Sequence, residues 1–165
     1  MMPLDDIMRK VDDLGVRHVT VTGGEPLAQP NVMQLMQRLT DAAFSVSVET
    51  SGALSVEHIP AEVVKVLDLK TPGSRESHRN LWSNLAHLNP QDQVKFVICS
   101  RADYDWARMR CDEHCLYERV SDVLFSPSHH ELPPRDLADW IVADRLPVRM
   151  QMQMHKLLWG DVPGR

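Results

Sequence analysis

Two glycines, a glutamate and a proline stand in a row at residues 23–26, between a predicted strand and a predicted helix. Glycines let the backbone approach a ligand and leave amide donors exposed. The Glu25 carboxylate can accept hydrogen bonds from an amino group, and Pro26 stiffens the turn. The glycine spacing differs from that of the dinucleotide-binding fingerprint. The string therefore marks a candidate ligand-binding turn, and an ordinary tight turn with a carboxylate at the helix start is the alternative.

Further strings repeat this design, because each places polar groups at a strand end before a turn. They are residues 49–52 (Glu-Thr-Ser-Gly), 68–73 (Asp-Leu-Lys-Thr-Pro-Gly) and 126–130 (Ser-Pro-Ser-His-His). Lys70 beside Asp68 can bind a carboxylate as a point charge. The alternative for these strings is turn chemistry with one surface ion pair, and for the two histidines it is simple exposure to solvent.

Cysteine and histidine residues in the second half of the chain could also carry chemistry. Cys111, His114 and Cys115, together with Cys99, could bind zinc, because Cys111 and Cys115 fall on one helix face. Structural zinc sites usually have two close ligand pairs, and the second pair is missing, so zinc is the least favoured hypothesis. His155 lies on the polar side of the last predicted strand, where it could bind a substrate or transfer a proton. A surface histidine is the alternative.

Strands and helices alternate along the chain, an order that predicts an α/β fold with a mostly parallel sheet. The predicted strands cover residues 18–22, 45–49, 63–69, 94–99, 122–125 and 148–155. The predicted helices cover residues 5–14, 32–39, 77–88, 104–114 and 135–143. A β/α unit normally opens on a strand, whereas this sequence opens on a helix. Either a first strand is missing or the fold begins on a helix.

Several predicted strands alternate polar and apolar residues, although parallel strands covered on both faces are apolar throughout. Thr20 and Thr22 share one side of the first strand, and Ser47 and Glu49 share one side of the second. Alternation sends successive side chains to opposite faces. We therefore expect one helix-covered apolar face and one polar face. A curled sheet that encloses the polar face as a wet cavity, with ligand groups at the strand ends, is favoured over plain exposed surface.

The composition is that of a globular protein in a reducing compartment. The 165 residues are 43% hydrophobic and 25% charged, with 18 Lys and Arg against 23 Asp and Glu. The net charge of −5 disfavours nucleic-acid binding, and no apolar run is long enough to span a membrane. The 3 cysteines argue against a disulfide framework. We expect one cytoplasmic domain over residues 1–165 that handles a small molecule.

Taken in order, five strings resemble those of the 7-carboxy-7-deazaguanine synthase family, radical S-adenosylmethionine enzymes of the queuosine precursor (7-deazapurine) pathway. They are residues 22–27, 49–52, 68–74, 125–127 and 155–160, and the resemblance covers essentially the whole chain. It implies an incomplete β/α barrel of the radical SAM type and a homodimer. It also implies a carbon–nitrogen lyase that turns 6-carboxy-5,6,7,8-tetrahydropterin into 7-carboxy-7-deazaguanine with loss of ammonia.

The resemblance also implies cofactors and the residues that bind them. Family members use a [4Fe–4S] cluster to cleave S-adenosylmethionine, Mg²⁺ assists the rearrangement, and a reductant such as flavodoxin or ferredoxin supplies electrons. The residues implied to bind S-adenosylmethionine are Gly23, Gly24, Glu25, Glu49, Ser51, Lys70, Ser126 and His129. Thr22 and His155 are implied to bind the pterin substrate.

One family string has no counterpart here. Family members carry Cys-x-x-x-Cys-x-x-Cys after the first strand, and neither it nor the neighbouring Asp-Thr that helps to bind magnesium occurs in this sequence. Three thiolates leave one iron open for the cofactor, so the radical chemistry cannot start without them. We therefore expect a chain without metal ligands, lacking the first strand and the cluster loop and having little catalysis of its own. A non-catalytic module that binds S-adenosylmethionine or pterin is the alternative.

Overall fold

Six strands form one parallel sheet in the order β1-β2-β3-β4-β5-β6, so each strand pairs with the next one in the chain. The computed structural model describes residues 2–160 and 162, without the side chains of residues 155 and 157. The strands are β1 His18–Val21, β2 Ser45–Thr50, β3 Val64–Leu69, β4 Gln93–Ile98, β5 Asp122–Pro127 and β6 Arg149–Met150. The α-helices are α1 Leu4–Asp13, α2 Val32–Asp41, α3 Arg101–Glu113, α4 Leu116–Arg119, α5 Pro134–Asp144 and α6 Met154–Trp159. Within the described part of the chain, no helix combines the length and apolarity needed to cross a bilayer.

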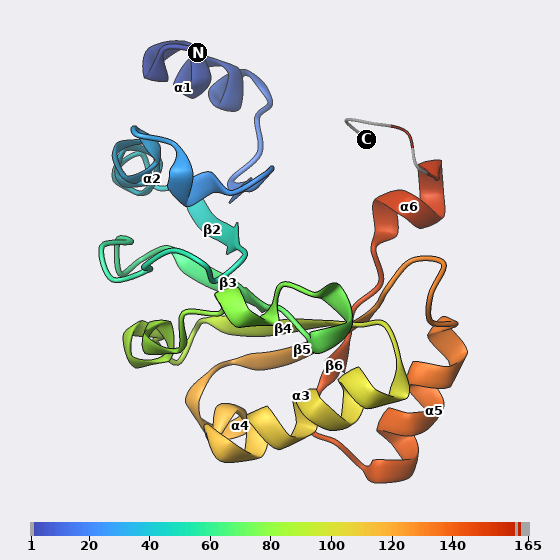
Figure 1. Cartoon of the computed structure of the whole chain (residues 1–165). Helices are drawn as coiled ribbons and strands as arrows, with labels where there is room; N and C mark the ends of the chain where they lie inside the picture. Colours follow the sequence, from blue (N-terminus) through green and yellow to red (C-terminus); the bar gives the residue numbers. More distant parts are fainter. Residues whose placement is uncertain (1, 161, 163–165) are drawn as a thin grey trace.

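Helices α2, α3 and α5 lie around the outer side of the curved sheet (Figure 1). Alternate strand residues form the core beneath them, and Val48, Phe96 and Phe125 are completely buried there. The residues between them, such as Ser47 and Lys95, belong to the opposite, inner face and are partly exposed. This arrangement confirms the predicted α/β fold and explains the alternation of polar and apolar residues in the strands.

A buried ion pair joins β3 to the loop before β4. The side chains of Lys65 and Asp92 are only 3% and 0% exposed, and Lys65 Nζ donates to Asp92 Oδ2 at 2.9 Å. The backbone amide of Lys65 donates to Asp92 Oδ1 at 2.8 Å, and the amide of Asn89 donates to Oδ2 at 2.7 Å. One carboxylate therefore satisfies a buried charge and two backbone donors, and it holds the start of β3 against the start of β4.

The helix predicted over residues 77–88 is wrong, because the segment forms two separate 3-10 turns, Ser77–Arg79 and Trp82–His87. Two asparagines bond to other loops. Asn80 pairs with the backbone N–H and C=O of Lys70, both at 2.9 Å. Asn84 accepts from the amide of Val56 and donates to two carbonyls in the loop after β2. These tertiary bonds replace the helix ladder that the apolar spacing suggested.

The closing strand predicted over residues 148–155 is also largely wrong. Only Arg149–Met150 pairs with β5, the amide of Gln151 adds one more bond to Phe125, and the chain then enters α6. Met, Lys and Leu are good helix formers, and they dominate α6. His155 therefore lies in a helix, not on the polar side of a strand, and its side chain lies outside the described residues.

Candidate functional site

A polar cavity of about 110 Å³ lies on the inner face, at the carboxyl ends of β1, β2 and β3 and beside Lys95 of β4. The sequence-predicted residues that line it are Thr22, Gly24, Glu49, Ser51 and Lys70. Its other lining residues are Thr50, Val66, Asp68 and Lys95. Three separate strings of the sequence therefore meet in one hollow, as the curled-sheet hypothesis requires. Sequence reasoning did not identify Lys95, although it occupies a polar position in an alternating strand.

The Glu25 carboxylate is fully occupied by donors from the chain itself. Its Oε1 accepts from the amide of Leu27 at 3.1 Å and from the hydroxyl of Thr50 at 2.9 Å. Its Oε2 accepts from the amide of Ser51 at 2.8 Å and from the hydroxyl of Ser51 at 2.5 Å. A carboxylate has about four acceptor positions, and all are used. These bonds fix the turn at residues 23–26 to the end of β2, and the expectation that Glu25 also accepts from an amino group of a ligand stays a prediction.

The environment of Glu25 favours its charged form. Burial by itself raises the pKa of Glu25, but the hydrogen bonds from Ser51, Leu27 and Thr50 together outweigh burial and hold the pKa below its ordinary value of 4.5. The carboxylate therefore stays ionised at neutral pH and keeps Gly24 and Ser51 on the same side of the cavity.

Asp68 and Lys70 form the charged centre of the site. Lys70 Nζ donates to Asp68 Oδ2 at 3.0 Å, and both side chains are largely buried. Asp68 Oδ1 is buried, and within the described residues it has no hydrogen-bond partner. Buried polar atoms without partners are rare, and a bound ligand is one explanation for them. An ammonium or hydroxyl of a ligand fits this acceptor.

A larger cavity of about 460 Å³ adjoins the first and shares Asp68 and Lys70 with it. The loop after β3 forms one wall of this larger cavity. Further lining residues are Val97, Cys99, Ser128 and Glu131. Burial and a hydrogen bond to Glu131 raise the pKa of Cys99 to about 11, so its thiol is protonated at neutral pH. The volume lies within the range of small-molecule sites, and Lys70 stands between the two compartments.

The loop after β3 is held in place by Asp103 at the start of α3. Asp103 is 1% exposed, and its carboxylate accepts from the amides of Gly73 at 2.8 Å and Cys99 at 3.2 Å. The backbone of Gly73 lies so close to the Asp103 carboxylate that a Cβ atom added at Gly73 would be 2.3 Å from Asp103 Oδ2. A buried carboxylate with two fixed bonds cannot move away freely, so this loop position requires glycine.

Gly73→Ala is expected to lower the free energy of unfolding by about 1–3 kcal/mol, because the added methyl group displaces Asp103. Urea denaturation followed by circular dichroism measures the change. Gly15→Ala is the control: its Cβ would meet no atom within 4 Å, and only its φ of +66° opposes alanine. A Gly73→Ala protein as stable as wild type would contradict the expected clash.

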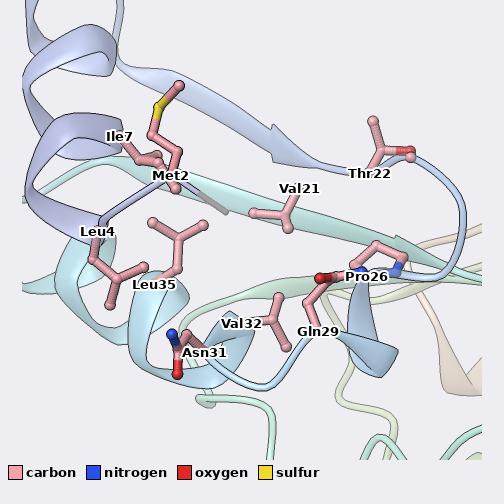
Figure 2. A pocket seen from close by; sticks show the side chains of 11 residues that line it. Met2, Leu4, Ile7, Val21, Thr22, Pro26, Gln29, Asn31, Val32 and Leu35 are labelled. Carbon is pink, nitrogen blue, oxygen red and sulfur yellow. The ribbon is translucent and has the colours of Figure 1, made fainter.

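Gly23 lies on the other side of the turn, against an apolar cavity of about 240 Å³. Figure 2 shows side chains from the N-terminal segment, from the end of β1 and from α2 pointing toward this cavity. Its apolar lining residues are Met2, Leu4, Ile7, Val21, Pro26, Val32 and Leu35. This lining does not suit a charged cofactor, so Gly24, but not Gly23, lies against the polar cavity.

The remaining predicted residues lie further along the sheet. Ser126 is completely buried on β5, and its hydroxyl has no partner among the described residues. His129 is exposed and lines a separate cavity of about 300 Å³ with Pro134 and Met152. The structure therefore does not bring Ser126 and His129 into the polar cavity at β1 to β4.

The described residues offer no ligand set for zinc or for an iron–sulfur cluster. In residues 2–160 and 162, no group of three or more His, Cys, Asp or Glu side chains is arranged to hold a metal. Cys99, Cys111 and Cys115 are free, and burial raises the pKa of Cys111 to about 12. The zinc hypothesis is therefore wrong for this part of the chain, and a [4Fe–4S] cluster finds no ligand set in it.

Comparisons with known proteins identify the family. The chain is 40% identical to the 7-carboxy-7-deazaguanine synthase of Koribacter versatilis over 172 residues, which cover 96% of this chain and 76% of the relative. It is 38% identical to that of Chlorobaculum tepidum over 162 residues, which cover 96% of this chain and 73% of the relative. A comparison with models of protein families found no match.

Solved structures agree in fold. The crystal structure of QueE from Escherichia coli matches with a TM-score of 0.71 at 20% identity, covering 92% of this chain and 64% of that one. This chain thus spans less than two thirds of the Escherichia coli protein. The crystal structure of Streptococcus suis SuiB bound to S-adenosylmethionine matches with a TM-score of 0.65 at 15% identity. The match covers 92% of this chain and 42% of SuiB. The fold is the partial α/β barrel of QueE, and the chain belongs to the 7-carboxy-7-deazaguanine synthase family.

Proposed function

We propose that this chain forms the S-adenosylmethionine and pterin sites of an enzyme that makes 7-carboxy-7-deazaguanine from 6-carboxy-5,6,7,8-tetrahydropterin. Substrate and product differ by one molecule of ammonia, so the overall reaction is an elimination with ring contraction and needs no net oxidant. The proposal includes a cytoplasmic homodimer in deazapurine biosynthesis, with a flavodoxin or ferredoxin as reductant and Mg²⁺ as a further cofactor. Family membership supports radical S-adenosylmethionine chemistry.

The observation that carries the proposal is the polar cavity at the carboxyl ends of β1, β2 and β3, beside Lys95 of β4. S-adenosylmethionine carries a carboxylate, an ammonium and a sulfonium, so its site needs both signs of charge. Lys70 supplies a cation, while Glu49 and the unpartnered oxygen of Asp68 supply acceptors in the same hollow. Because the cavity is half-buried, these charges act with less screening than on an open surface.

Roles follow for the predicted residues. The backbone at Gly24 and the side chains of Glu49, Ser51 and Lys70 bind the cofactor, and Glu25 positions them through the turn. Gly23 shapes that turn, and Ser126 and His129 flank the adenosyl group from the next strand end. Thr22 faces the pterin, and His155 in α6 closes over the substrate. The described residues provide no ligand set for the cluster, so their chemistry is binding and orientation.

A second candidate is a module that binds S-adenosylmethionine or pterin without radical chemistry, and the polar cavity supports it equally. The two candidates share the binding site and differ in turnover. Only the enzyme releases 5′-deoxyadenosine when it is reconstituted anaerobically with iron and sulfide and then supplied with S-adenosylmethionine, a reductant and 6-carboxy-5,6,7,8-tetrahydropterin.

Titration calorimetry with S-adenosylmethionine tests the shared site. Wild type is expected to bind, and Lys70→Met to bind about tenfold more weakly, because a charge-assisted contact is lost. Lys10→Met removes an exposed lysine of α1 and serves as the matched control. Absence of both heat and a thermal shift with wild type would rule out the site. Binding followed by release of deoxyadenosine and the deazaguanine product would favour the enzyme.

A further inference from the structure

Two lysines lie inside the central strands of the sheet, and their surroundings differ. Lys65 on the outer face of β3 is 3% exposed and is paired with Asp92. Lys95 on the inner face of β4 is half-buried, and within the described part of the chain its ammonium has neither an ion pair nor a hydrogen bond. Partial burial penalises a charge that has no counter-charge. The Lys95 ammonium is therefore available to pair with a counter-charge on a bound ligand.

The neighbouring carboxylate does not fill that role. Asp68 is the register partner of Lys95 across β3 and β4, and both line the same cavity. However, Asp68 Oδ2 accepts from Lys70, while Oδ1 is buried without a partner among the described residues. The cavity thus holds an unpaired cation and an unpaired acceptor on adjacent strands. A ligand with a carboxylate beside an N–H or O–H donor complements both.

We propose that Lys95 is a ligand-binding residue whose ammonium holds a carboxylate of the molecule in this cavity. The inference rests on the proposed function, which supplies two ligands with a carboxylate, S-adenosylmethionine and the carboxypterin. Lys70 lies two residues beyond Asp68, about 7 Å further along the strand direction. The Lys70 ammonium nevertheless reaches back to Asp68 Oδ2 at 3.0 Å, so Lys70 already has a counter-charge in the chain. Lys95 is the cation of this cavity that is left to pair with a ligand carboxylate.

Lys95→Met tests the inference with two ligand pairs that differ by one carboxylate. The pairs are S-adenosylmethionine with its decarboxylated form, and 6-carboxypterin with pterin, each titrated by calorimetry. Wild type is expected to prefer the carboxylate member by about tenfold or more. In Lys95→Met that preference is expected to disappear in at least one pair, and that pair identifies the carboxylate which Lys95 holds.

Two further variants separate charge from structure. Lys95→Arg keeps a cation and is expected to retain most of the preference, whereas Lys10→Met on the exposed side of α1 is expected to retain all of it. Without ligand, the melting temperature of Lys95→Met should equal or exceed that of wild type, because an unpaired half-buried charge has been removed. A merely structural lysine would change stability without changing the preference for a carboxylate.

The outcomes distinguish this inference from the proposed function. If Lys95→Met keeps the carboxylate preference in both pairs, Lys95 holds no carboxylate and the inference fails alone. If wild type binds neither S-adenosylmethionine nor 6-carboxypterin, the proposed function fails and the inference fails with it.

Discussion

Asp92→Ala is expected to lower the free energy of unfolding by about 3–5 kcal/mol, because it leaves the Lys65 ammonium buried without a partner. The same substitution strips the amides of Lys65 and Asn89 of their acceptors. These losses coincide at the junction of β3 and β4, where the carboxylate is completely buried. Urea denaturation followed by intrinsic fluorescence measures the change. The m-value, the slope of the unfolding free energy against urea concentration, is compared between the variants.

Lys65→Met is the informative partner of this variant. It removes the buried cation and keeps a side chain of similar length, while Asp92 still accepts from two backbone amides. We expect Lys65→Met to cost clearly less stability than Asp92→Ala, and the double variant to cost less than the sum of the two. Strict additivity would mean that the two side chains do not interact.

Glu25→Ala is expected to weaken S-adenosylmethionine binding about tenfold or more and to lower the free energy of unfolding by about 1–3 kcal/mol. The substitution leaves the Ser51 amide and the Thr50 hydroxyl without their acceptor and frees the turn that carries Gly24. Gly24 and Ser51 line the polar cavity, so the variant no longer holds either of these two cofactor-binding residues in position. Calorimetry and urea denaturation on the same protein preparation measure both effects.

Glu25→Gln is the matched control because it keeps the shape and one acceptor oxygen. The pKa of Glu25 is lowered in the folded protein, so its ionised form stabilises the fold fully above the ordinary value of 4.5. That stabilisation is lost as the pH falls through the folded-state value. The stability difference between wild type and Glu25→Gln should therefore shrink below about pH 4.5. A difference independent of pH would show that ionised Glu25 contributes nothing.

The site could be predicted from sequence wherever its signal was local. Glycines and polar residues at strand ends are visible in short strings, and a parallel sheet brings such ends to one edge. Gly24, Glu49, Ser51 and Lys70 stand in such strings and line one cavity, which Thr22, assigned through the family resemblance, lines as well.

The contacts and elements that the sequence analysis did not predict depend on residues far apart in the chain or on segments with two competing patterns. Glu25 reaches Ser51 across 26 residues of sequence, and Lys65 reaches Asp92 across 27, so no periodicity reveals either pair. In the segment at residues 77–88, asparagines that bond to distant loops overrode an apolar helical spacing. In the segment at residues 148–155, methionines satisfied the alternation expected of a strand and the propensity of a helix equally well.

The strand order has a consequence for how this chain reaches its fold. Because every strand pairs with its immediate successor, a chain emerging from the ribosome can add each new strand to an edge that already exists. No early strand has to wait for a distant partner, which keeps loop-closure entropy low at each addition. Ribosome-stalled chains from whose exit tunnel β4 has just emerged should therefore already protect the amides of β2 and β3 from hydrogen exchange.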